Sequence, residues 1–117
     1  MSTLLGPGDR VVCSRLGVAE NPRTRMKGLL GRQSLGPGEG LLLKPAGSVH
    51  TAFMRFPIDV IFLDASMQVL RVERGVPPWR LKGTRGARAV LEMAAGAAER
   101  HGIAAGMTLR LADGAPA

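Results

Sequence analysis

Two apolar runs joined by a tight turn read Asp59-Val-Ile-Phe-Leu-Asp64, Ala65-Ser66 and Met67-Gln-Val-Leu-Arg-Val-Glu-Arg74. The first run is apolar at every position between its two aspartates, which is typical of a central strand covered on both faces. The second run alternates in period two, as a strand with one buried face does. A turn as short as this one joins antiparallel neighbours. We therefore predict a β-hairpin here and a mainly β protein around it.

The rest of the chain adds short elements to this hairpin. Strands are predicted over residues 10–16, 41–43, 48–54 and 107–111. A helix is predicted to begin at Asn21-Pro22, because Asn is a good N-cap and Pro suits the first helical position. Residues 1–8 are expected to form a loose arm, 75–88 a loop, and 112–117 a frayed tail.

Residues 89–100 allow two interpretations. Ala, Leu, Glu and Met all favour one helix through Arg100. Gly96 favours a strand to about Met93 followed by a short helical turn. Either way, the expected fold class is mainly β (α+β). We expect a compact, small β-barrel-like domain of about six short strands with one or two short helices. It would be a single domain over residues 1–117 with its core at about 9–112.

Composition restricts the class of protein further. The 117 residues are 45% hydrophobic and 21% charged, which is globular rather than disordered composition. One cysteine excludes an intrachain disulfide and a zinc site built from several thiolates. No apolar run approaches the roughly 18 residues of a membrane span, and the first residues lack a secretion signal. We therefore expect a cytoplasmic protein without a membrane span.

The formal net charge of +7 is unevenly distributed. One basic stretch lies around the predicted helix, and a second lies over 71–88, where Glu73 is the single acid. The six basic residues of that second stretch are Arg71, Arg74, Arg80, Lys82, Arg85 and Arg88. Such a field attracts polyanions. The chain has no Tyr and one Trp, however, so it lacks the stacking aromatics that single-strand nucleic-acid binders use. A solvated basic face is therefore favoured over a nucleic-acid site.

Several short motifs occur in a characteristic order. They are Arg25-Met-Lys-Gly-Leu-Leu-Gly-Arg32, Gly40-Leu-Leu-Leu43, His50-Thr-Ala-Phe-Met-Arg-Phe-Pro-Ile-Asp-Val-Ile-Phe-Leu-Asp64, Val90-Leu-Glu-Met-Ala-Ala-Gly96 and Gly102-Ile-Ala-Ala-Gly106. Together they resemble the family called domain of unknown function 192, over nearly the whole chain from about Val11 to Leu111. The most specific part is Phe53 to Asp64, which is similar to the family pattern Phe-(Trp or Phe)-Met-(Lys or Arg)-x-x-x-Pro-(Leu or Ile)-Asp.

The resemblance implies a compact, mainly β, barrel-like fold with a short helix, and a biochemical role that is uncharacterised. This chain departs from the family at two points. Many relatives carry a secretion or lipoprotein signal, and many have Trp-Met-Lys-Asn-Thr where this chain has Phe53-Met-Arg-Phe56. Pocket chemistry that depends on that Trp or Asn does not transfer.

The segment from His50 to Asp59 concentrates polar chemistry, with a base, a hydroxyl, a cation and a carboxylate within ten residues. Asp59 could accept a charge-assisted hydrogen bond from Arg32 or Arg55. The favoured interpretation is plainer: Asp59 caps backbone N–H groups at a corner, and Arg55 is a structural ion-pair partner. Trp79, between Pro78 and Arg80, is either an exposed anchor for a partner or a ring lying over the edge of the core.

The leading hypothesis is a non-enzymatic binding or accessory module with an Arg-rich rim, for a small anionic ligand or a protein partner. Its ligand-binding residues would be Arg32, His50, Met54, Arg55, Asp59, Trp79 and Arg80. One alternative is binding of an anionic polymer or nucleic acid through 71–88. Another is a hydrolase-like enzyme using His50 and Asp59, which is less favoured because the chain contains no recognisable catalytic motif. No cofactor is predicted. No metal site is predicted either, since the His, Cys and Met spacing matches no ligand pattern.

Overall fold

The structure, a computed structural model, describes residues 2–20, 34–52 and 54–112. The predicted hairpin is confirmed. Its strands are β5 (Ile58–Leu63) and β6 (Val69–Val76), which pair antiparallel with Val60 opposite Glu73. Every residue of β5 is buried, as its continuous apolar run predicts.

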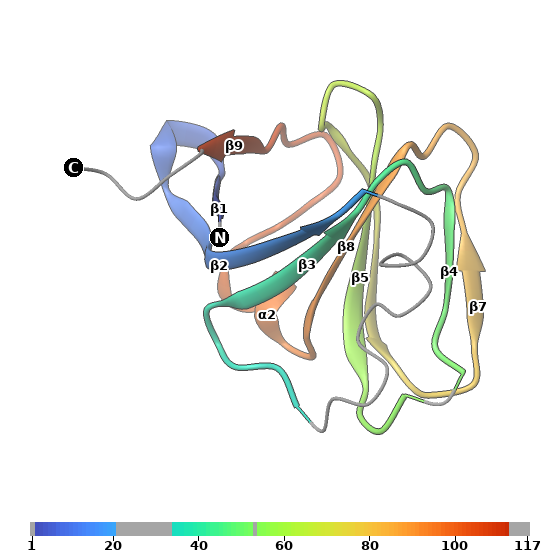
Figure 1. The fold of residues 1–117 in the computed structure, drawn as a ribbon. Helices are drawn as coiled ribbons and strands as arrows, with labels where there is room; N and C mark the ends of the chain where they lie inside the picture. The colour runs from blue at the N-terminus through green and yellow to red at the C-terminus, as the bar shows by residue number, and fades with distance from the viewer. Residues whose placement is uncertain (1, 21–33, 53, 113–117) are drawn as a thin grey trace.

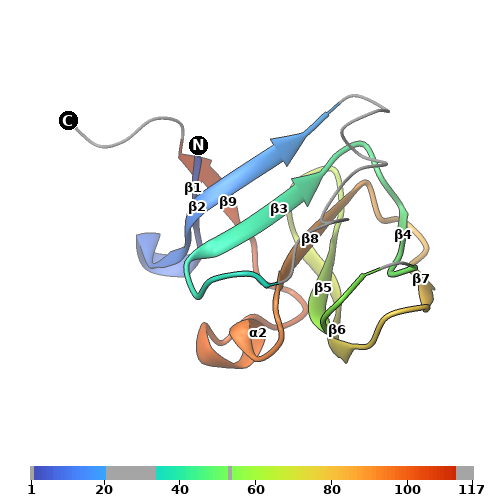
Figure 2. The same cartoon turned by 60° about the horizontal axis from the view of Figure 1, so that its bottom comes forward.

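The described residues form nine strands, more than the six expected. Besides β5 and β6 they are β1 (Ser2–Leu5), β2 (Val11–Ala19), β3 (Glu39–Leu43), β4 (Ser48–His50), β7 (Leu81–Gly83), β8 (Ala89–Ala94) and β9 (Arg110–Ala112). Seven of them make one sheet in the order β6-β5-β8-β3-β2-β1-β9, in which only β2 and β3 run parallel. β4 and β7 make a separate antiparallel pair. Figures 1 and 2 both show this pair on the opposite side of the molecule from β1 and β9.

The expected barrel is not confirmed, because the seven-stranded sheet does not close. Its edge strands, β6 and β9, make no continuous ladder with each other. One isolated bridge between Gln68 and Thr108 joins the two edges, and the N–H of Val69 donates to the carbonyl oxygen of Met107 at 2.7 Å. The sheet therefore curls far enough for its edges to meet at one corner, as strand twist permits.

Three other expectations about individual segments are wrong. The N-terminal residues are not a loose arm, because β1 pairs with both β2 and β9 and Leu4 is fully buried. The 75–88 segment is not all loop, because β6 extends to Val76 and β7 lies within it. The strand predicted over 48–54 is shorter, since β4 ends at His50.

Of the two interpretations for residues 89–100, the strand followed by a helical turn is the observed one. β8 is followed by the four-residue helix α2 (Ala97–Arg100). Gly96 separates them with a φ of 94°, in the left-handed region that a helix-favouring side chain would resist. The helix predicted from Asn21 lies outside the described residues. Within the described ranges, no helix has the length and apolar character that crossing a membrane requires.

The sheet carries an apolar cluster on each face, and β8 contributes to both. Leu91 and Met93 belong to one cluster, which also includes residues of α2, whereas Val90 belongs to the other. This second cluster includes Val49 of β4 and Met54. The β4–β7 pair is therefore packed on the second face of the main sheet through Val49.

Candidate functional site

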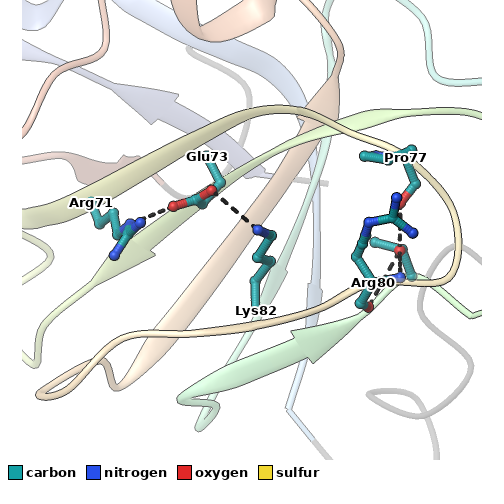
Figure 3. A network of polar contacts seen from close by, with 6 residues as sticks. Arg71, Glu73, Pro77, Arg80 and Lys82 are labelled. Atoms are coloured by element: carbon teal, nitrogen blue, oxygen red, sulfur yellow. Dashed lines mark hydrogen bonds and ion pairs between the residues drawn. The ribbon is translucent and has the colours of Figure 1, made fainter.

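Thr51, directly after β4, connects that strand to the loop before β7. Its side chain is buried, and its hydroxyl donates to the carbonyl oxygen of Pro77 at 2.7 Å while accepting the N–H of Arg80 at 2.8 Å. Its backbone N–H donates to the Arg80 carbonyl at 2.8 Å, and its carbonyl accepts the N–H of Trp79 at 3.0 Å. Figure 3 shows the hydrogen bonds that involve Pro77 and Arg80. One buried threonine thus fixes the path of residues 77–80.

That path presents two large apolar side chains to solvent. Trp79 is 61% exposed and Leu81 is 74% exposed. Trp79 has a φ of 66°, which is strained for a bulky residue. Leu81 lies directly opposite His50 in the β4–β7 ladder, so their side chains share one face. We call the surface formed by His50, Trp79, Arg80 and Leu81 the β4–β7 ledge.

The ledge contains one exposed cation, Arg80. Glu73 of β6 is the single acid of residues 71–88, and it already forms two ion pairs (Figure 3). One is with Arg71, and the other is with Lys82 of β7, whose Nζ lies 3.7 Å from Glu73 Oε1. The side chains of Arg55 and Arg80 are exposed. Neither is paired with a carboxylate among the residues that the structure describes. The Lys82–Glu73 pair links β7 to β6, and Arg55 and Arg80 are exposed cations.

Asp59 lies elsewhere, in the interior, and makes three hydrogen bonds to backbone. Its Oδ1 accepts the N–H of Gly75 at 2.8 Å, and its Oδ2 accepts the N–H groups of Gly96 at 3.1 Å and Ala98 at 2.9 Å. Asp59 therefore caps the first turn of α2 and holds the end of β6. This is the capping role that the sequence favoured, whereas the ion-pair role expected for Arg55 is not observed with any residue that the structure describes.

The predicted site residues that the structure describes lie in different surroundings. His50 lies opposite Leu81 in the β4–β7 ladder, and Trp79 and Arg80 directly precede Leu81 in the chain. Met54 is buried in the second apolar cluster, and Asp59 faces α2. Arg32 lies outside the described residues. Leu81 was not predicted as a site residue. Residues 75–88 were expected to form a loop, so the position of Leu81 on β7, opposite His50, was not foreseen.

Glu92 is a second residue that the sequence did not single out. It stands on β8 directly between Leu41 of β3 and Val60 of β5, on the face of the second apolar cluster. Burial raises its pKa to about 7. The signal available in the sequence was an acid inside the apolar run from Ala89 to Ala95.

The described residues bring together no group of three His, Cys, Asp or Glu side chains that could hold a metal ion. Cys13 is buried in the first apolar cluster, and its Sγ donates to the carbonyl oxygen of Gly38 at 3.3 Å. Burial raises the pKa of this thiol, so it is not an activated nucleophile.

Comparison with known proteins agrees with this fold. A sequence model of the family domain of unknown function 192, described as "Uncharacterized ACR", matches residues 5–111. The chain belongs to this family. Among curated proteins, none matches the sequence.

Two solved structures are similar to this member of the family. One is a protein of unknown function from Novosphingobium aromaticivorans, with 27% identity and a TM-score of 0.80, covering 93% of this chain and 82% of that one. The other is a putative transcription regulator from Sinorhizobium meliloti, with 21% identity and a TM-score of 0.81, covering 94% of this chain and 91% of that one. The fold is shared by both, and no reaction is attached to either description.

Proposed function

We propose that this chain is a non-enzymatic binding module that docks an acidic, extended segment of a partner protein on the β4–β7 ledge. The observation that carries the proposal is the outward presentation of Trp79 and Leu81 on a loop held rigidly by buried Thr51. The proposal keeps three residues of the sequence-based site, namely His50, Trp79 and Arg80.

The apolar part of the ledge supports a protein partner. Trp is among the residues that contribute most when an interface buries them, and Leu81 extends the same surface. Covering a large apolar side chain contributes roughly 1.5–3 kcal/mol. The strained backbone of Trp79 adds a second argument, because strain of this kind is retained where a surrounding structure imposes it, often at binding sites.

The charge around the ledge selects the chemistry of that partner. Arg55 and Arg80 are exposed cations, and Glu73 is already engaged by Arg71 and Lys82. An acidic segment would therefore be attracted to this surface, and a basic one would be repelled.

The backbone of β7 supports an extended conformation for the bound segment. The N–H of Thr51 bonds to the carbonyl oxygen of Arg80. In an antiparallel ladder the next residue turns its backbone groups the other way, so those of Leu81 point away from β4. A partner strand could pair with that edge, which is a recurring mode of peptide recognition.

The chain carries its own reporter for a direct test. Trp79 is the single Trp and there is no Tyr, so the intrinsic fluorescence of the protein comes from the ledge. We would titrate the protein with a short synthetic peptide of alternating Glu and Leu, using its Lys-Leu counterpart as the charge control. The expected result is a blue shift of the Trp79 emission with the acidic peptide only, because docking removes water from the ring.

Two variants provide matched controls. Leu81→Ser should weaken binding of the acidic peptide by about tenfold, since it removes an apolar contact worth more than 1.4 kcal/mol. Val11→Ser changes another exposed apolar residue, 48% exposed on β2, and should leave binding unchanged. Equal binding by both variants, or no spectral response to the acidic peptide, would contradict the proposal.

Binding of an anionic polymer through 71–88 remains the second candidate. It is favoured by the exposed arginines of β6 and of the loop before β8, and a structural neighbour is described as a putative transcription regulator. A DNA duplex binding tightly at about 50 mM salt and weakly at about 300 mM would support it. If such a duplex bound while the acidic peptide did not, this candidate would replace the ledge proposal.

The hydrolase-like alternative receives no support from the geometry. A general base needs a nucleophile and an orienting acid within reach. The Asp59 carboxylate instead uses both oxygens for backbone N–H groups at α2 and Gly75. The cytoplasmic location stays a prediction from the sequence.

A further inference from the structure

A hollow of about 270 Å³ lies at one end of four neighbouring strands, away from the ledge residues. It is formed where β2 and β3 end, where β5 turns towards β6, and where β8 begins, and these strands are adjacent in the sheet. Its lining residues are Glu20, Lys44, Pro45, Asp64, Ala65, Met67, Arg88 and Ala89.

Backbone hydrogen bonds fix the positions from which the two cations of the hollow extend. The N–H of Arg88 donates to the carbonyl oxygen of Leu63 at 2.8 Å, and the Arg88 carbonyl accepts the N–H of Ala46 at 2.9 Å. The N–H of Lys44 donates to the carbonyl oxygen of Ala19 at 3.1 Å. Both cationic side chains therefore start from ordered strand ends rather than from free loops.

The charges of the hollow are of both signs. Lys44 and Arg88 form no ion pair with any residue in the described part of the chain. Asp64 uses Oδ1 to accept the N–H groups of Ser66 at 2.8 Å and Gln68 at 2.9 Å. Those two bonds orient the carboxylate, and its Oδ2 makes no hydrogen bond to another described residue.

The remaining lining is apolar apart from Glu20, which is a second acid of the hollow. Pro45, Ala65, Met67 and Ala89 contribute no charged group, and Met67 also packs against the first apolar cluster. The volume lies just below the range of about 300–1,000 Å³ that is typical of small-molecule sites. A ligand of this hollow is therefore small, with both charges and an apolar part.

From these observations we infer that the hollow binds a small zwitterion, specifically a free α-amino acid with an apolar side chain. The ligand carboxylate meets Lys44 and Arg88, and the ligand ammonium meets Asp64. The ligand side chain lies against Met67 and Ala89. The inference does not depend on the ledge, because it uses none of the ledge residues.

Isothermal titration of the full chain with three related compounds tests the inference. L-leucine carries both charges, L-leucinamide lacks the carboxylate, and N-acetyl-L-leucine lacks the ammonium. Each missing charge should weaken binding by about tenfold or more, because a charge-assisted hydrogen bond is roughly twice as strong as a neutral one. Equal affinity for L-leucine and N-acetyl-L-leucine, or no heat from L-leucine, would overturn the assignment.

Substitutions locate the binding. Arg88→Gln and Lys44→Gln should each weaken L-leucine binding by about tenfold, since each removes one contact to the carboxylate. Arg85→Gln removes an exposed arginine that does not line the hollow and should bind as the unmodified protein does. Thermal unfolding of each variant checks that it is folded. Unchanged affinity in the folded Arg88→Gln and Lys44→Gln variants would place any binding elsewhere.

The same titration separates this inference from the proposed function. Leu81→Ser should weaken binding of the acidic peptide and leave L-leucine affinity unchanged, whereas Arg88→Gln should weaken L-leucine binding and leave peptide affinity unchanged. Weakened binding of both ligands by either folded variant would contradict the independence of the two sites.

Discussion

At the scale of single residues, Asp59 illustrates how a buried carboxylate organises backbone that is distant in sequence. It holds Gly75 at the end of β6 and Gly96 and Ala98 at the start of α2. Gly75 and Gly96 have φ values of 58° and 94°, which glycine adopts without steric cost. These conformations direct the N–H groups of Gly75 and Gly96 toward the Asp59 carboxylate. The carboxylate therefore has a structural role, and its removal should lower the free energy of unfolding.

The first prediction concerns that removal. Asp59→Ala leaves three N–H groups without their acceptor, so we expect the free energy of unfolding to fall by roughly 3 kcal/mol or more. Urea denaturation followed by circular dichroism measures this loss. Glu99→Ala, in the exposed part of α2, is the matched control and should change stability by less than about 0.5 kcal/mol. A loss below about 1 kcal/mol for Asp59→Ala would show that the cap contributes little.

Trp79 is the opposite case, a residue whose local conformation disfavours the folded state. Its positive φ suits glycine, and its side chain is mostly in solvent. We predict that Trp79→Gly abolishes docking of the acidic peptide, because it removes the largest apolar side chain of the ledge. Peptide binding is followed by anisotropy of a labelled peptide, because the variant has no Trp. Unchanged peptide affinity in the folded variant would contradict the proposed role of Trp79.

At the scale of elements, the β4–β7 pair is too short to be stable alone. Each strand has three residues, and isolated two-stranded hairpins are marginal in water. Thr51 holds the loop that leads into β7, Val49 inserts into the second apolar cluster, and Lys82 pairs with Glu73. The ledge exists because these three contacts attach the pair to the main sheet.

Thr51 allows a test of how the loop before β7 is held. Thr51→Val keeps the shape and removes the hydroxyl, leaving the Arg80 N–H without its acceptor at 2.8 Å. We expect a loss of about 1–3 kcal/mol in unfolding free energy and a changed Trp79 emission in the folded state. Thr51→Ser retains the hydroxyl and should restore most of the stability and the original emission. Identical spectra for the Val and Ser variants would mean that the hydroxyl does not set the loop.

At the scale of the whole molecule, both faces of the sheet are apolar, and Glu92 is the acid placed within one of them. Its folded pKa, about 7, lies above the usual value of 4.5. The unfolded chain therefore ionises first as pH rises, and the folded state binds the extra proton between these values. The contribution of Glu92 to stability is fully present below pH 4.5 and is lost as pH rises through about 7.

The corresponding prediction compares the unmodified protein with Glu92→Gln at about pH 5 and about pH 8. The unmodified protein should lose on the order of 2 kcal/mol more than the variant over this interval, because only it ionises a buried carboxyl. Urea denaturation at both pH values measures the difference, with Glu99→Gln as the exposed control. Parallel pH dependence of the variant and the unmodified protein would show that Glu92 ionises normally in the fold.

The elements predicted correctly from sequence are those whose signals are local. The β5–β6 hairpin follows from two adjacent apolar runs and a turn, and the break at Gly96 follows from one glycine. β1 was missed because the neighbouring Gly6-Pro7-Gly8 suggested a loop, and because one of its two partner strands, β9, lies about a hundred residues away. The site was predicted only in part for the same reason, since Asp59 finds its partners in Gly75, Gly96 and Ala98.

The family, the mainly β class and the net positive charge could all be predicted from the sequence, because motif order, apolar periodicity and charge are properties of the chain read in order. Three further features depend on the assembled fold: the open seven-stranded sheet, the solvent exposure of Trp79 and Leu81, and the meeting of Lys44, Asp64 and Arg88 in one hollow. Each of these depends on contacts between residues far apart in the chain. The free energy of such contacts is set by burial and hydrogen bonding in the assembled fold, which no local pattern encodes.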